Sequence, residues 1–151
     1  MANVTSILND LIETSKDGEK GFRTSAEETR SGELKSVFVA RADECAKAAA
    51  TLQQLVTRLG GDPESGGSVA GAVHRGWVNL KASVTGRSDL AILEECERGE
   101  DVAKARYKKA LDVELPIDIR GIVQLQYNGV VQNHDQIRDL RDRYRSSQPQ
   151  H

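Results

Sequence analysis

The sequence has few aromatic residues, few prolines and only two cysteines. Aromatic residues make up 4% of its 151 residues, and there are three prolines. β-Sandwiches need many aromatic and β-branched strand residues, so this composition disfavours them and is typical of helices. Cys45 and Cys96 are not spaced as CxxC. They therefore predict neither a zinc knuckle nor a disulfide framework.

Long apolar runs and charge of one sign are also lacking. No run approaches the roughly 20 apolar residues that a membrane-spanning helix needs, and the first residues lack the basic and long apolar regions of a signal peptide. Charged residues make up 29% of the chain, the net charge is −2, and basic residues are scattered among acidic ones. Nucleic-acid binding needs a basic surface, which this pattern does not predict. We expect a cytoplasmic protein that binds neither membranes nor nucleic acid.

Four long stretches have apolar residues every three or four positions, which is the spacing of amphipathic helices. Gly60 and Gly61 predict the end of the second stretch, Ser88 an N-cap for the third, and Pro116 the first turn of the fourth. The predicted helices, each about 40 Å long, cover residues 3–29, 32–59, 88–114 and 117–145.

The connections predict how these helices are arranged. Tight turns at residues 30–32 and near Pro116 each join an antiparallel pair, whereas residues 60–87 are long enough to travel back along the whole bundle. Apolar residues recur in the second half of this crossover, which predicts a short helix there. We therefore expect residues 1–146 to form one all-α domain, a ferritin-like four-helix bundle of two antiparallel hairpins and a long crossover. A flexible tail is expected at residues 147–151.

One carboxylate is predicted to point into the bundle. Cys96, Ala103 and Tyr107 mark the apolar face of the third helix, and Glu100 lies on that same face. A buried carboxylate is costly unless it is paired, protonated or bound to a cation.

Three further polar residues are predicted to lie at the level of Glu100. Glu44 and Glu100 each lie 12 residues into their helices, and Glu19 and His134 lie 10 and 11 residues before the ends of theirs. In a crossover bundle these positions coincide. The sequence therefore predicts an inner polar layer of Glu19, Glu44, Glu100 and His134.

Such a layer is the ligand set of a carboxylate-bridged metal centre, which takes one Glu from each of two helices and Glu-x-x-His from each of the others. Here Glu44 is followed three residues later by Lys47 instead of His, and His134 is preceded three residues earlier by Val131 instead of Glu. A full di-iron centre is therefore not expected. A single Fe, Mn or Zn ion and a metal-free polar core remain as alternatives.

The crossover and the cysteines allow two further predictions. In His74-Arg75-Gly76-Trp77, the tryptophan is expected to anchor the crossover while His74 and Arg75 bond to helix ends; a partner-binding surface is the alternative. Cys45 and Cys96 differ by about 7.5 Å in level, too far for an easy disulfide. Buried, unreactive thiols are favoured over a redox sensor.

Several segments resemble a bacterial ferritin-like four-helix-bundle family catalogued as a domain of unknown function. They are NDLIETSKDGEKGF (9–22), GGDPESGGSVAGAVHRGWVNLK (60–81), LEECERGEDVAKARYKKAL (93–111) and HDQIRDLRD (134–142). The resemblance implies the fold and a bacterial cytoplasmic setting, with no established activity. A looser similarity to rubrerythrin-type proteins supplies the metal-ligand pattern that Lys47 and Val131 break.

Two functions are consistent with these features. The first is a non-catalytic binding or interaction protein whose polar layer is structural, with a second copy of the chain or another protein as its partner. The second is a metal-binding protein or oxidoreductase with an altered carboxylate and histidine site, near Tyr107 and Tyr127.

Overall fold

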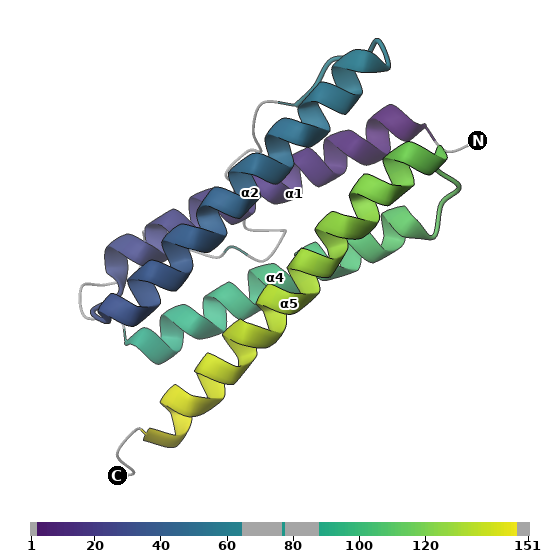
Figure 1. The fold of residues 1–151 in the computed structure, drawn as a ribbon. Coiled ribbons are helices and arrows are strands. Elements are labelled where there is room, and N and C mark those ends of the chain that lie inside the picture. The colour runs from purple at the N-terminus through teal and green to yellow at the C-terminus, as the bar shows by residue number, and fades with distance from the viewer. Residues whose placement is uncertain (1–2, 65–76, 78–87, 148–151) are drawn as a thin grey trace.

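The chain is described by a computed structural model that covers residues 3–64, Trp77 and residues 88–147. These residues form four α-helices, which are α1 (Val4–Glu28), α2 (Gly32–Arg58), α4 (Asp89–Leu111) and α5 (Ile117–Ser147) (Figure 1). The prediction of an all-α protein with four helices is confirmed. Within this part of the chain, no helix combines the length and apolar character needed to cross a membrane.

Local sequence explains where the helices begin and end. At the starts of α1, α2 and α4, an N-cap side chain accepts a hydrogen bond from a backbone N–H of the first turn, and these N-caps are Asn3, Ser31 and Ser88. After α2, Gly60 has a φ of 83°, a left-handed conformation that favours glycine and that ends helices.

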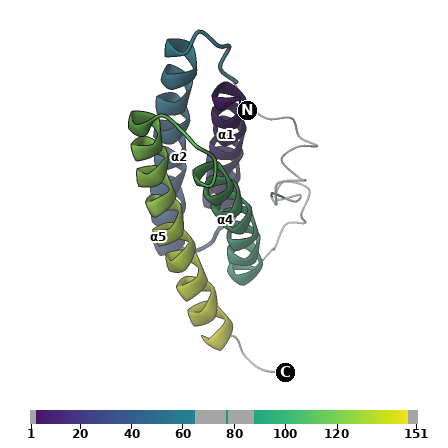
Figure 2. The same ribbon diagram turned by 90° about the vertical axis from the view of Figure 1, so that its right-hand side faces the viewer.

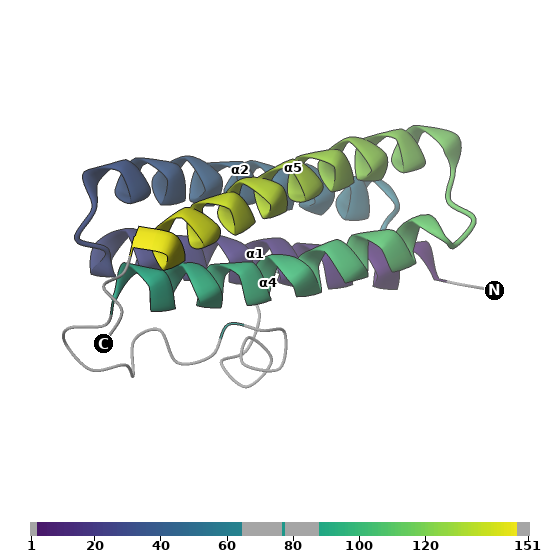
Figure 3. The same ribbon diagram turned by 90° about the horizontal axis from the view of Figure 1, so that it is seen from below.

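The helices form two hairpins that lie in two layers. α1 packs against α2, α4 packs against α5, and α1 also packs against α4. Figures 2 and 3 show α2 and α5 in one layer and α1 and α4 in the other. α2 and α5 touch at only a few positions. The two predicted hairpins are confirmed, and the seam between α2 and α5 is the least tightly packed of the four.

Hydrogen bonds show which helix ends lie together. The Asp89 carboxylate, at the start of α4, accepts hydrogen bonds from Thr29 Oγ1 at 2.6 Å and from the Arg30 backbone N–H at 3.1 Å. Near the end of α5, the Tyr144 hydroxyl donates to Ser31 Oγ at 3.0 Å. α2 and α4 therefore start at the same end of the bundle and run parallel. Most of residues 60–87, including the predicted short helix, lie outside the described residues.

The apolar core is divided into two clusters along the bundle. The first apolar cluster, near the turn between α1 and α2, is built around Phe22, Phe38, Leu93 and Ile137. The second apolar cluster, toward the other end, is built around Leu8, Ile12, Leu52, Tyr107 and Val123. The section between these clusters contains buried polar side chains and a cavity.

Candidate functional site

The centre of the bundle holds an ion pair that joins α2 to α4. Arg41 Nε donates to Glu100 Oε1 at 3.1 Å, and Arg41 Nη2 donates to Glu100 Oε2 at 3.4 Å. Arg41 is 7% exposed and Glu100 is 2% exposed. α2 and α4 are not packed directly on each other, so the two side chains meet across the interior. Glu100 points inward as predicted, and its partner is a guanidinium.

Burial and ion pairing shift the pKa of each partner in opposite directions. Burial raises the pKa of the Glu100 carboxyl above its ordinary value, and the neighbouring Arg41 opposes that rise. The carboxylate in turn raises the pKa of Arg41, although burial acts in the opposite direction. Removing either member would leave the other charge buried without its main partner, which is far more costly than removing both.

A chain of hydrogen bonds joins all four helices on the other side of the central section. Ser15 Oγ on α1 lies 3.1 Å from the Tyr107 hydroxyl on α4, and that hydroxyl donates to Gln126 Oε1 on α5 at 2.8 Å. The Gln126 amide then donates to the Ala48 carbonyl on α2 at 3.4 Å. This last bond bridges the seam between α2 and α5. Burial raises the pKa of Tyr107, so its phenol remains a neutral donor.

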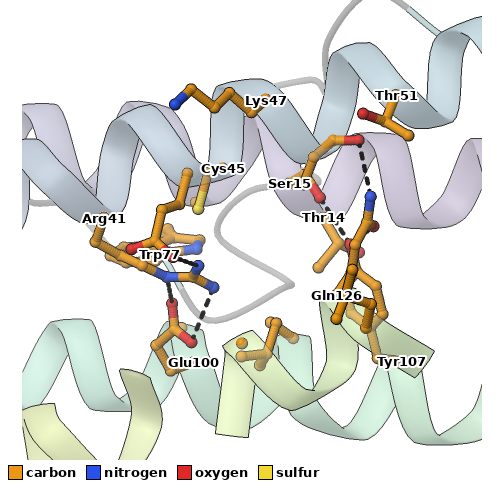
Figure 4. Close-up of a pocket in the computed structure, with 18 residues that line it drawn as sticks. Thr14, Ser15, Arg41, Cys45, Lys47, Thr51, Trp77, Glu100, Tyr107 and Gln126 are labelled. Carbon is orange, nitrogen blue, oxygen red and sulfur yellow. Dashed lines mark hydrogen bonds and ion pairs between the residues drawn. The ribbon is translucent and has the colours of Figure 1, made fainter. Parts of the chain in front are cut away.

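A cavity of about 280 Å³ lies between the ion pair and the hydrogen-bond chain. Figure 4 shows Arg41 and Glu100 on one side of it, and Ser15, Tyr107 and Gln126 on the other. The exposed residues that line it come from α2 and α5 and are Glu44, Lys47 and Leu125. Its lining residues on α1 and α4 are mostly buried. The cavity therefore opens to solvent through the seam between α2 and α5.

Trp77 forms part of the cavity wall and is held between two glycines. A Cβ atom added to Gly21 on α1 or to Gly99 on α4 would lie 2.3 Å from the indole ring. The ring also makes an edge contact with Phe22, with ring centroids 5.2 Å apart. Trp77 is 9% exposed. The two glycines thus form a notch that a side chain of any other residue would fill, and the indole occupies it. His74 and Arg75 lie outside the described residues.

The other predicted ligands do not join Glu100. The Glu19 carboxylate pairs with Arg23 at 3.2 Å, and the side chain of Glu44 is 60% exposed with its carboxylate 3.9 Å from Arg41 Nη1. His134 is buried, and its Nε2 and Nδ1 atoms lie 2.6 and 3.2 Å from Asp101 and Asp135.

These positions do not fit a metal centre. Among residues 3–64, 77 and 88–147, no three His, Cys, Asp or Glu side chains are grouped as ligands. Glu19 and His134 are instead directed toward other charged side chains, and Glu44 and Glu100 share one cation, Arg41. The inner polar section is present, but the predicted grouping of Glu19, Glu44, Glu100 and His134 is not.

Both cysteines are buried and free. Burial raises the pKa of each thiol to about 12, and Cys96 Sγ lies 3.2 Å from Ser25 Oγ. A thiol with so high a pKa is protonated at neutral pH and is a poor nucleophile.

Besides Gln126 and the two glycines of the notch, Arg41 and Ser15 are site residues that the sequence analysis did not identify. Both carry a signal in the helical spacing, because Arg41 follows Phe38 by three residues and Ser15 follows Ile12 by three. Each therefore lies on a buried face, as Glu100 does. This spacing marks Ser15 as a polar residue of the core, but on α2 it marks Arg41 and Glu44 alike and does not decide which of them turns inward.

Comparison with known proteins gives a family and no assigned activity. Among curated proteins, none matches this chain. A family model described as "Domain of unknown function (DUF2383)" matches residues 3–113, a region that contains α1, α2 and α4. The matched region includes Arg41, Glu100, Trp77 and both glycines of the notch. The chain belongs to this family, the DUF2383 domain of unknown function.

Proposed function

We propose that this chain is a single-domain, ferritin-like binding protein that is not an enzyme, and that the cavity between its helices takes a small molecule. The observation that supports this most is the buried Arg41–Glu100 pair in the wall of a cavity that opens to solvent. Small-molecule sites are concave, mostly apolar, and contain a few well-placed polar groups.

The arrangement of the helices supports the ferritin-like part of the proposal. The two hairpins are antiparallel, and the contacts of Asp89 and Tyr144 bring the start of α4 and the end of α5 to the same end as the turn between α1 and α2. A long crossover is needed to connect such hairpins. In this proposal Arg41 supplies the positive charge that a metal ion supplies in related bundles.

The chemistry of the cavity wall supports binding over catalysis. The Cys45 thiol lines the cavity, but its pKa of about 12 keeps it protonated. The Tyr107 hydroxyl is hydrogen-bonded to Gln126, and burial raises its pKa. Arg41 and Glu100 neutralise each other. These groups can orient a molecule through hydrogen bonds, whereas an activated nucleophile needs a lowered pKa or an adjacent base.

The proposal is tested by a fragment screen monitored by ¹H–¹⁵N NMR. Fragments that bind are expected to shift the amide signals of residues around the cavity, among them Ala48, Glu100 and Gln126. Ala48→Leu places a larger side chain in the cavity and should abolish these shifts. Ala50→Leu is the matched control, because Ala50 is an exposed residue of the same helix that does not line the cavity.

The proposal would be wrong if no fragment shifts these signals, or if the shifts survive in Ala48→Leu as fully as in Ala50→Leu.

Self-association is a separate prediction, made from the long helices. Light scattering coupled to size-exclusion chromatography tests it, and a monomer at high protein concentration would remove it.

A further inference from the structure

We propose that the molecule bound in this cavity is a small organic acid, with its carboxylate on Arg41 and its apolar body against Trp77. This inference rests on the proposed function and names the class of ligand. It is drawn from the hydrogen-bonding capacity of Arg41, the charges at the mouth of the cavity and the character of its walls.

Arg41 has donors that Glu100 does not use. A guanidinium has five N–H donors, and the Glu100 carboxylate engages only Nε and Nη2. Among the described residues no hydrogen bond from Nη1 is seen, and its ion pair with the Glu44 carboxylate is long, at 3.9 Å. The edge formed by Nη1 and Nη2 is a planar fork that matches a second carboxylate. Arg41 lines the cavity and is 7% exposed, so a bond formed there is largely removed from water.

Lys47 provides a second positive charge at the mouth. It lines the cavity from the exposed side of α2, and no ion pair engages its ammonium group within the part of the chain that the structure describes. Glu44 has the opposite effect, because its carboxylate lies at the same mouth and repels an anion. Its side chain is 60% exposed, so solvent screens it more than the buried pair. Neutralising Glu44 should therefore strengthen the binding of an anion.

The remaining wall suits an apolar body. Trp77, Ala103, Val130 and Leu125 line the cavity together with three glycines, which are Gly18, Gly99 and Gly129. A dry cavity of about 150 Å³ holds benzene, so 280 Å³ accommodates a molecule with about ten to twelve non-hydrogen atoms. Benzoate is slightly smaller than this limit, has one carboxylate and an apolar ring, and is the probe that we choose.

The test is a set of NMR titrations with benzoate, benzamide and benzylamine, which share a ring and differ in charge. Benzoate is expected to shift the signals of Arg41, Glu100 and Lys47, and to bind at least about tenfold more tightly than benzamide, the gain expected from a charge-assisted hydrogen bond. Benzylamine should bind more weakly still. Added salt should weaken benzoate binding and leave benzamide binding nearly unchanged.

Three substitutions check the role of each charge. Lys47→Met and Glu44→Gln change exposed side chains, so both proteins should fold, and benzoate binding should weaken about threefold in the first and strengthen about threefold in the second. Arg41→Lys retains the charge beside Glu100 but removes the planar fork, and should lose tenfold or more in affinity.

The inference is overturned if benzamide or benzylamine binds as tightly as benzoate, if Lys47→Met and Glu44→Gln leave benzoate affinity unchanged, or if benzoate does not bind. The first result leaves the cavity as a binding site for a neutral or cationic molecule, and the second leaves it as a site whose mouth charges do not act on the ligand. Both leave the proposed function standing. Failure of all three probes in a protein whose fragment screen also finds no ligand removes both.

Discussion

The residue that determines the chemistry of this bundle is Arg41. A guanidinium taken out of water is costly, and the Coulomb attraction of a buried carboxylate offsets that cost only when the geometry is good. Glu100 provides such a partner through two hydrogen bonds. The consequence is a central section that carries both charges and no net charge.

The pair predicts a pH-dependent loss of stability in Arg41→Met. Without Arg41, the largest influence that opposes burial is lost and only the weaker ones of Asn133 and His134 remain, so the folded-state pKa of Glu100 rises further above the ordinary value of 4.5. Between the unfolded-state and folded-state pKa values, the Glu100 carboxyl is protonated in the folded variant and ionised in the unfolded chain. Its stability is therefore fully present below about pH 4.5 and falls as pH rises through the folded-state pKa. Relative to the unsubstituted protein, we expect a small deficit near pH 5 and about 3–5 kcal/mol near pH 8.

Urea unfolding at the two pH values measures this deficit. The double variant Arg41→Met with Glu100→Gln is the control, because it has neither charge and its deficit should not depend on pH at this site. An equal deficit of Arg41→Met at both pH values would show that Glu100 is not coupled to Arg41.

The notch for Trp77 gives a second prediction at this scale. Gly99→Ala places a methyl group where the indole lies, and overpacking of this kind costs about 1–3 kcal/mol. The protein has one tryptophan, so its fluorescence reports this position directly, and we expect a red shift as the ring becomes exposed to water.

Gly121→Ala is the matched control for the notch. An added Cβ meets nothing within 4 Å at Gly121, so this substitution in an exposed helix should stabilise the protein by up to about 1 kcal/mol. Unchanged fluorescence in Gly99→Ala would mean that the indole does not occupy the notch in solution.

At the scale of the elements, Asp89 connects the two hairpins. Its carboxylate accepts hydrogen bonds from Thr29 and from the Arg30 backbone, and so it ties the turn between α1 and α2 to the first turn of α4. Asp89→Ala removes both bonds, and hydrogen bonds to charged groups contribute about 1.5–3 kcal/mol each. We expect a loss of about 3 kcal/mol in the free energy of unfolding, the lower end of the sum for two such bonds, because the bond from Arg30 is exposed to solvent.

Urea unfolding of Asp89→Ala and Asp139→Ala checks this expectation. The side chain of Asp139 is 73% exposed and contacts only its neighbour Arg138 among the described charged residues, so its removal should change stability by about 0.5 kcal/mol or less. Equal effects of the two substitutions would contradict the role of Asp89.

The helices and hairpins could be predicted because each depends on local sequence. Helical spacing, the Ser31 and Ser88 N-caps and the left-handed Gly60 all act within a few residues. The notch could not be predicted, because Gly21 and Gly99 lie on different helices and receive an indole from a third segment. Only tertiary packing brings these three together.

The inner residue of α2 could not be predicted for a different reason. Arg41 and Glu44 are three positions apart, so they lie on adjacent parts of one helix face. Spacing places both near the bundle interior and does not decide which one turns inward. The long apolar stem of arginine covers buried surface while its guanidinium reaches Glu100. Glu44 is shorter and remains at the mouth of the cavity, where its side chain is 60% exposed.

At the scale of the whole molecule, the bundle is packed at both ends and open in the middle. Two apolar clusters hold the ends together, and the cavity separates the polar groups between them. Within residues 3–64, 77 and 88–147, only the Gln126–Ala48 hydrogen bond bridges α2 and α5 beside the cavity. In the proposed function a small molecule enters the cavity through this seam, and the apolar ends supply the stability that the open section lacks.

The most direct test of the central claim is elemental analysis of the purified, untagged protein after incubation with Fe(II), Mn(II) or Zn(II) and desalting. The claim is that Arg41 provides the positive charge beside Glu100, so we expect no stoichiometric metal and no change in the free energy of unfolding when metal is added. The claim would be contradicted if the protein retained about one equivalent of metal or more and the Glu100→Ala variant did not. Glu100 would then be a metal ligand and Arg41 a residue that moves aside.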